Sequence, residues 1–146
     1  MTDRTDWLLL LLSGDALRVP DPGPLDPVRV QKGMFLLSKR GPARDLYSFR
    51  PYNWGPFSPA IYSDLDELEA QGLIEQRRPA GHSWKMCATT PKGDERARAI
   101  AADLSDDDVA WMAQTRRFLT TRSFAKLLED VYDLYPDFAT QSRFRR

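Results

Sequence analysis

Residues that could support catalysis are sparse in this chain. His82 is the single histidine and Cys87 the single cysteine, and they fall at the tip and within the second strand of a predicted hairpin. A Cys–His nucleophile needs both side chains within hydrogen-bond reach, and one histidine with one cysteine cannot complete a zinc site. Asp106–Asp108 matches no calcium-loop spacing, and we find no glycine-rich phosphate loop. We therefore expect no enzyme activity, no metal site and no cofactor.

Composition indicates one globular domain that carries at most a small appendage. The chain has 146 residues, of which 42% are hydrophobic and 29% charged, with 21 basic and 21 acidic side chains. A single cysteine forms no internal disulfide, which is typical of a reducing cytoplasm. The longest apolar run, Trp7–Leu12, is far shorter than the roughly 20 residues of a membrane helix. We expect a cytoplasmic protein with no membrane partner.

The zero net charge is the sum of alternating blocks. Residues 27–63 carry six basic side chains against Asp45, and residues 64–75 carry five acids and no base. Residues 77–98 then carry six bases against two acids. Each block produces a local field that a charged partner can sense, although such blocks are also typical of solvated helix faces.

Caps, breakers and hydrophobic periodicity predict a mainly helical chain. Helices are expected over 6–12 with Thr5 or Asp6 as the cap, over 27–40, 59–71 and 91–104, after Ser105, and from Ser123 to Pro136. Residues 19–27 read as a loop, because they hold four prolines and a glycine. A short strand is expected over 47–52, ended by Pro51, with a turn at Gly55-Pro56. A hairpin is expected over 73–78 and 83–89, with its tip at 79–82.

This order of elements is typical of a winged helix-turn-helix, in which the third helix and the hairpin wing lie beside nucleic acid. We therefore predict a mainly α fold with a small β-hairpin. The winged helix-turn-helix domain is expected over 1–104, and a C-terminal helical extension with a basic tail over 105–146. Trp111, Phe118 and Phe124 supply apolar surface to this extension, which we expect either to form a dimerisation arm or to cap the domain.

The segment Tyr52–Tyr62 has an aromatic residue before Gly-Pro, a small residue and a helix containing tyrosine. It resembles the winged-helix-like family around SocA-type antitoxins, the Panacea domain, and its uncharacterised bacterial and archaeal relatives. Val30–Leu37 and Trp7–Leu12 are similar to two helices of that group, and Leu68–Ile74 with Thr89–Gly93 resemble the wing region of PadR- and MarR-like regulators. The resemblance covers residues 7–98 and implies either DNA-binding regulation or antitoxin-like protein binding.

The first functional hypothesis is a DNA-binding transcriptional regulator of bacterial type, which binds double-stranded DNA as a homodimer so that two wings meet two half-sites. Basic side chains of the wing would hold the DNA, helped by others after the second helix and by two serines at the start of the third helix. The wing residues are Arg77, Arg78, His82 and Lys85, the backbone contacts are Lys39, Arg40 and Arg44, and the serines are Ser58 and Ser63. Lys32 is expected on the same positive surface.

The second hypothesis is an antitoxin- or adaptor-like protein-interaction module. The third helix holds four carboxylates and no Lys or Arg, whereas DNA presents mostly acceptors beside a dense phosphate charge. The partner-binding residues would be Trp54, Phe57, Tyr62, Asp66 and Glu67, since aromatic residues anchor interfaces. The aromatic cluster over 47–62 has a second interpretation, in which it packs the short strand against the helices.

Overall fold

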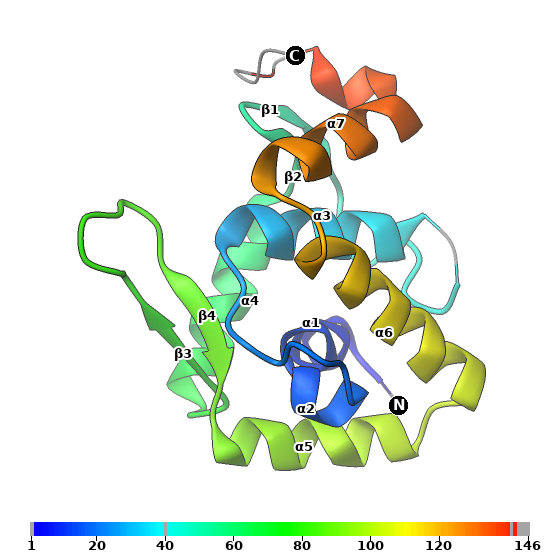
Figure 1. Ribbon diagram of the computed structural model, residues 1–146. Coiled ribbons are helices and arrows are strands. Elements are labelled where there is room, and N and C mark those ends of the chain that lie inside the picture. The colour runs from blue at the N-terminus through cyan, green and yellow to red at the C-terminus, as the bar shows by residue number, and fades with distance from the viewer. Residues whose placement is uncertain (1, 40, 141, 143–146) are drawn as a thin grey trace.

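The computed structural model describes residues 2–39, 41–140 and 142 of the chain (Figure 1). It is mainly helical, with two small antiparallel strand pairs. The elements are α1 (Arg4–Leu12), α2 (Gly14–Leu17), α3 (Pro27–Ser38), β1 (Arg50–Tyr52), β2 (Gly55–Phe57), α4 (Pro59–Ala70), β3 (Ile74–Arg77), β4 (Met86–Thr89), α5 (Pro91–Ala102), α6 (Asp106–Thr120), α7 (Phe124–Leu134) and the 3₁₀ turn η1 (Pro136–Ala139).

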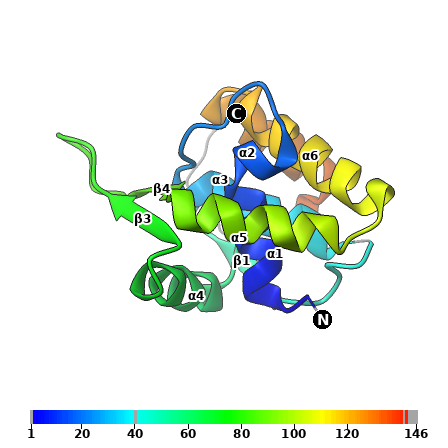
Figure 2. The same ribbon diagram turned by 90° about the horizontal axis from the view of Figure 1, so that it is seen from below.

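Helix α1 lies in the middle of the molecule, with α3, α5 and α6 around it (Figure 1, Figure 2). Its residues Leu8–Leu12 are at most 2% exposed, as expected for a helix that is apolar on every side. The predicted cap at Thr5 or Asp6 is wrong, because Asp3 is the N-cap and exchanges hydrogen bonds with Asp6. This capping box satisfies two backbone N–H groups at once, which a single cap at either predicted position does not achieve.

The other helix starts follow the predicted capping signals. Asp26, Thr90, Ser105 and Ser123 each accept a hydrogen bond from a backbone N–H in the first turn of their helix. At the end of α4, Gly72 has a φ of +75°, the left-handed conformation that glycine tolerates best.

The strands correct the prediction at two places. Pro51 lies inside β1 rather than ending it, and the predicted turn at Gly55-Pro56 is strand β2, which pairs with β1. Proline is tolerated there because each strand of a two-stranded ribbon is an edge strand. In the second pair β3 and β4 run antiparallel, and Leu25, from the predicted loop, forms a β-bridge to Cys87 on the open side of β4.

The hydrophobic core runs across the predicted boundary at residue 104. Met112, Leu119, Leu127 and Val131 of α6 and α7 belong to the same buried cluster as the leucines of α1. The described residues of the predicted extension therefore complete the core of the preceding helices. None of the described helices is long and apolar enough to cross a membrane.

Arg116 connects α6 to the N-terminal helices from inside the core. Its side chain is fully buried, and its guanidinium donates to the carbonyls of Leu11, Leu12, Asp21 and Gly23. Two of these acceptors are terminal carbonyls of α1, which have no partner within the helix. One cation therefore satisfies the end of α1 and the loop that follows α2.

We predict that Arg116→Met lowers the free energy of unfolding by about 3 kcal/mol, because four carbonyls, two of them on the buried residues Leu11 and Leu12, lose their donor together. The control is Arg117→Ala, since Arg117 is the exposed neighbour on the same helix. Denaturant unfolding of the two variants checks this. Equal midpoints for Arg116→Met and Arg117→Ala would show that the buried guanidinium contributes nothing.

Candidate functional site

The β3–β4 hairpin projects from the helical body and carries the predicted wing cations (Figure 1). Arg77, Arg78, His82 and Lys85 are all exposed, and Arg77 forms an ion pair with Glu75 at 3.0 Å. His82 packs against Trp84 with ring centroids 4.4 Å apart, and Trp84 is 45% exposed. Trp84 was expected inside the strand predicted over 83–89 and was not a candidate site residue. The strand begins only at Met86, and Trp84 lies in the loop before it.

The remaining predicted DNA contacts lie elsewhere. The loop after α3, which holds Arg44, is on the opposite side of the body from the hairpin in both views (Figure 1, Figure 2). Lys39 follows the C-terminal end of α3 beside that loop, and Arg40 lies outside the described residues. The structure therefore does not bring these cations onto one surface with the hairpin.

Two residues expected at the positive surface are buried, so those expectations are wrong. Ser58 is 2% exposed, and Lys32 is 1% exposed. The cap-then-proline pattern at Ser58-Pro59 correctly marks the start of α4. The Ser58 side chain, however, makes no capping hydrogen bond, and the Ser58 backbone is hydrogen-bonded to the Gln31 side chain of α3. Ser63 is exposed on the first turns of α4.

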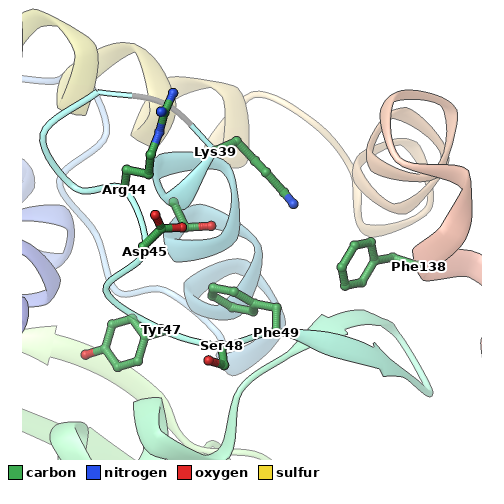
Figure 3. Close-up of a pocket in the computed structure, with 8 residues that line it drawn as sticks. Lys39, Arg44, Asp45, Tyr47, Ser48, Phe49 and Phe138 are labelled. Carbon is green, nitrogen blue, oxygen red and sulfur yellow. The ribbon is translucent and has the colours of Figure 1, made fainter.

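Lys39 and Arg44 instead line a cavity of about 390 Å³ at the end of α3 (Figure 3). The Lys39 ammonium lies over the rings of Phe35, Tyr135 and Phe138, at 4.6, 5.2 and 5.4 Å from their centroids. Figure 3 shows Lys39 extending towards Phe138, while Asp45, Tyr47 and Phe49 come from the loop after α3. These cation–π contacts orient Lys39 along the cavity wall.

The acidic residues of α4 do not form one uniform face. Asp64 is buried, with Arg4 Nε 2.8 Å and the Tyr47 hydroxyl 2.5 Å from its carboxylate oxygens. Asp66 and Glu69 are exposed and accept hydrogen bonds from the Gln76 side chain on β3. The exposed charge of α4 therefore comes from Asp66, Glu67 and Glu69, and the repulsion expected from four carboxylates is smaller than the sequence suggests.

An aromatic patch lies between the β1–β2 ribbon, the start of α4 and the start of α7. We define it as Tyr52, Trp54, Phe57, Tyr62 and Phe124. Its ring centroids form two contact groups: Tyr52–Phe57–Tyr62 at 4.7 and 5.7 Å, and Trp54–Phe124 at 5.7 Å. Four of its rings, all except Phe57, are between 38% and 45% exposed. The structure thus brings together Trp54, Phe57 and Tyr62 of the predicted partner-binding set.

The other aromatic residues of the cluster pack inward. Tyr47 is 7% exposed, and Phe49 meets Phe35 of α3 edge to face, with centroids 5.3 Å apart. The two interpretations of the cluster therefore apply to different halves. Tyr47 and Phe49, before β1, pack the loop against the core, whereas Tyr52, Trp54 and Tyr62 are exposed.

Two consecutive side chains of α3 hold the patch in place. Gln31 accepts from the Ser58 N–H at 2.8 Å and donates to the Ser58 carbonyl at 2.9 Å. Lys32 Nζ donates to the carbonyl of Trp54. Both side chains are buried, so these hydrogen bonds form out of water, where an unpaired partner is costly.

A cavity of about 170 Å³ opens among these groups, lined by Lys32, Gln31 and aromatic-patch residues. Burial lowers the pKa of Lys32 to about 7, partly offset by the field of Asp26. Sequence reasoning missed this site, because neither the spacing nor the charge of Lys32 indicates that its side chain points inward.

The described residues form no cluster of metal-ligating side chains. They contain no group of three or more His, Cys, Asp or Glu side chains that could hold a metal ion. Cys87 is buried in β4, and burial raises the pKa of its thiol to about 12, whereas His82 lies at the exposed hairpin tip. No protein-family model and no curated protein matches the chain.

We predict that Gln31→Met frees the backbone of Ser58 and loosens the β1–β2 ribbon. Two buried hydrogen bonds are lost, and the amide exchange of residues 52–58 should quicken about tenfold or more. Gln71→Met is the matched control, because Gln71 is exposed and its side chain bonds only to Glu67 among the described residues. Hydrogen exchange measured by mass spectrometry compares the two. Unchanged exchange in this segment would contradict the anchoring role of Gln31.

Proposed function

We propose that this chain is a protein-interaction module of the antitoxin or adaptor kind, and that the aromatic patch is its docking surface. The observation that carries the proposal is the exposure of four neighbouring aromatic side chains, Tyr52, Trp54, Tyr62 and Phe124, around a ribbon held by Gln31 and Lys32. Large exposed apolar patches mark interaction sites, and aromatic anchors contribute much of the binding energy of interfaces.

Charge next to the patch indicates the chemistry of the partner. The exposed carboxylates Asp66, Glu67 and Glu69 lie further along α4 than Tyr62, so they flank the patch on one side. A polypeptide that inserts an apolar or aromatic side chain and carries Lys or Arg beside it would complement both features. We infer a basic protein segment as the occupant.

The fold itself is proposed to be a winged helix-turn-helix. The supporting observation is the element order, with α3 and α4 as the helix pair and the β3–β4 hairpin as the wing. In this proposal the protein is a non-enzymatic, cytoplasmic homodimer. Leu134 of α7 is 60% exposed and offers apolar surface to a second copy. Sedimentation at micromolar concentration tests the dimer, and a monomer there would reject it.

We predict that Trp54→Ala weakens partner binding by about 2 kcal/mol, roughly thirtyfold, because a central aromatic anchor is lost. The backbone carbonyl that Lys32 binds remains in this variant. The partner is identified by affinity capture with the full chain and mass spectrometry, and calorimetry on the purified pair then measures the affinities.

The matched control is Trp84→Ala, a tryptophan of similar exposure on the hairpin. We expect it to leave the affinity unchanged, and charge reversal at Asp66 and Glu67 to slow association. A loss of affinity in Trp84→Ala with none in Trp54→Ala would place the docking surface on the hairpin and reject the patch.

The β3–β4 hairpin supports a second candidate, DNA binding by a transcriptional regulator. The specific observation is that Arg77, Arg78 and Lys85 stand exposed beside the packed His82–Trp84 pair. Basic side chains on a projecting hairpin can contact phosphates, and an exposed aromatic ring can stack on a base. Because Lys39 and Arg44 lie elsewhere, the hairpin would have to hold DNA without them.

If the hairpin binds DNA, the double variant Arg77→Ala/Arg78→Ala should weaken binding and reduce the salt-dependence slope by about 2, since two phosphate contacts disappear. Arg44→Ala is the control, because Arg44 lies on the opposite side of the body (Figure 1, Figure 2). Fluorescence anisotropy with genomic fragments over a range of salt concentrations measures both. An unchanged slope in the double variant would reject this candidate.

A further inference from the structure

We propose that the cavity of about 170 Å³ beside the aromatic patch is a binding site for a small carboxylate with a flat, apolar body, and that Lys32 is the cation that receives it. The cavity shares Tyr52, Trp54, Phe57 and Tyr62 with the aromatic patch. A small carboxylate needs no protein partner, so separate measurements test the two proposals.

The charge of the cavity wall favours an anion as the ligand. Lys32 is 1% exposed and is the only charged residue among the described residues that line the cavity. None of the described carboxylates forms an ion pair with it; Asp26, whose field reaches Lys32, pairs with Arg29 instead. A buried ammonium without a counter-ion is unfavourable, so the site offers an uncompensated positive charge to an anion.

The Lys32 ammonium has hydrogen-bonding capacity that the described residues do not use. A lysine ammonium has three N–H donors, and the one acceptor that the described residues give it is the carbonyl of Trp54. Gln31, on the same cavity wall, directs both its amide oxygen and its amide nitrogen to the Ser58 backbone, and no hydrogen bond between it and Lys32 is found among the described residues. A carboxylate oxygen would supply the acceptor that the ammonium lacks.

The shape of the cavity fits a flat ring. Tyr52 and Phe57 on the wall are stacked, with centroids 4.7 Å apart and an angle of 27° between the ring planes, and Tyr62 lies beside them. Gly55 has a φ of +99°, and a Cβ built on it would lie 3.1 Å from Lys32 Nζ, so glycine keeps the space next to the ammonium open. An apolar cavity of about 150 Å³ accepts benzene, so a single-ring carboxylate matches the volume.

Protonation of Lys32 sets the pH dependence. The titratable or charged groups near it are Asp26 before α3, Tyr52 of β1, Tyr62 of α4 and Tyr132 of α7. Since burial lowers the pKa of Lys32 to about 7, the ammonium form dominates below that pH and is lost above it. A bound carboxylate favours the ammonium and raises this pKa, and its affinity must therefore fall as the pH rises through 7.

The test is calorimetric titration of the full chain with benzoate and with its neutral isostere benzamide, about one pH unit below and one above the pKa of Lys32. We expect benzoate to bind about tenfold more weakly at the higher pH, where roughly a tenth of Lys32 stays protonated, and benzamide affinity to stay constant. Lys32→Met should abolish the preference for benzoate, and Lys32→Arg should remove its pH dependence. Lys39→Met, in the other cavity, should change neither.

The wild-type chain supplies a measurement that does not depend on the folding of a variant. Carbon NMR of the lysine ε position should show one titration near pH 7 that moves upward when benzoate is added and stays in place with benzamide. The proposal is overturned if benzoate binds no better than benzamide to the wild-type chain, or if benzoate leaves that titration unmoved. If the wild-type chain fails to bind benzoate, while Trp54→Ala still weakens binding of the protein partner, only the carboxylate site is rejected.

Discussion

The aromatic patch depends on two buried polar side chains of α3, Gln31 and Lys32. Gln31 holds both backbone groups of Ser58, and Lys32 holds the carbonyl of Trp54. Together they fix the ribbon between α3 and α4 at two points, where its own two three-residue strands would be marginal in isolation. Aromatic rings on such a ribbon can stay exposed in a defined arrangement, because their backbone is held from beneath.

Burial of charged side chains decides which charges of the alternating blocks reach the surface. Lys32, counted with the basic block of residues 27–63, contributes nothing to the outer surface. Asp64, counted with the acidic block, is buried, forms an ion pair with Arg4 and accepts a hydrogen bond from the Tyr47 hydroxyl. Among the exposed charges are an acidic side of α4 and a basic hairpin, with Lys39 and Arg44 around a separate cavity. Under the proposed function, separated patches of opposite sign complement a polypeptide, whereas a run of phosphates is bound by a continuous positive surface.

Local signals in the sequence predict the helices well and the site only in part. Asp26-Pro27, Thr90-Pro91, Ser105 and Ser123 mark helix starts because capping is decided within a few residues. Burial is decided by contacts far along the chain: Lys32 meets residue 54, and Arg116 reaches Leu11 from 105 positions away. For the same reason Ser58 and Lys32 read as surface residues, and the exposure of Trp84 was not anticipated. The partner-binding set Trp54, Phe57 and Tyr62 is close in sequence, and its grouping was predictable.

The segment that a bound partner protects from exchange tests the role of the aromatic patch most directly. Hydrogen exchange of the full chain, measured with and without the protein that it captures, reports protection along the whole backbone. We expect slower exchange over residues 52–62, which carry most of the aromatic patch, and little change over residues 78–85 at the hairpin tip. Protection confined to 78–85, with 52–62 unchanged, would contradict the assignment of the aromatic patch as the docking surface.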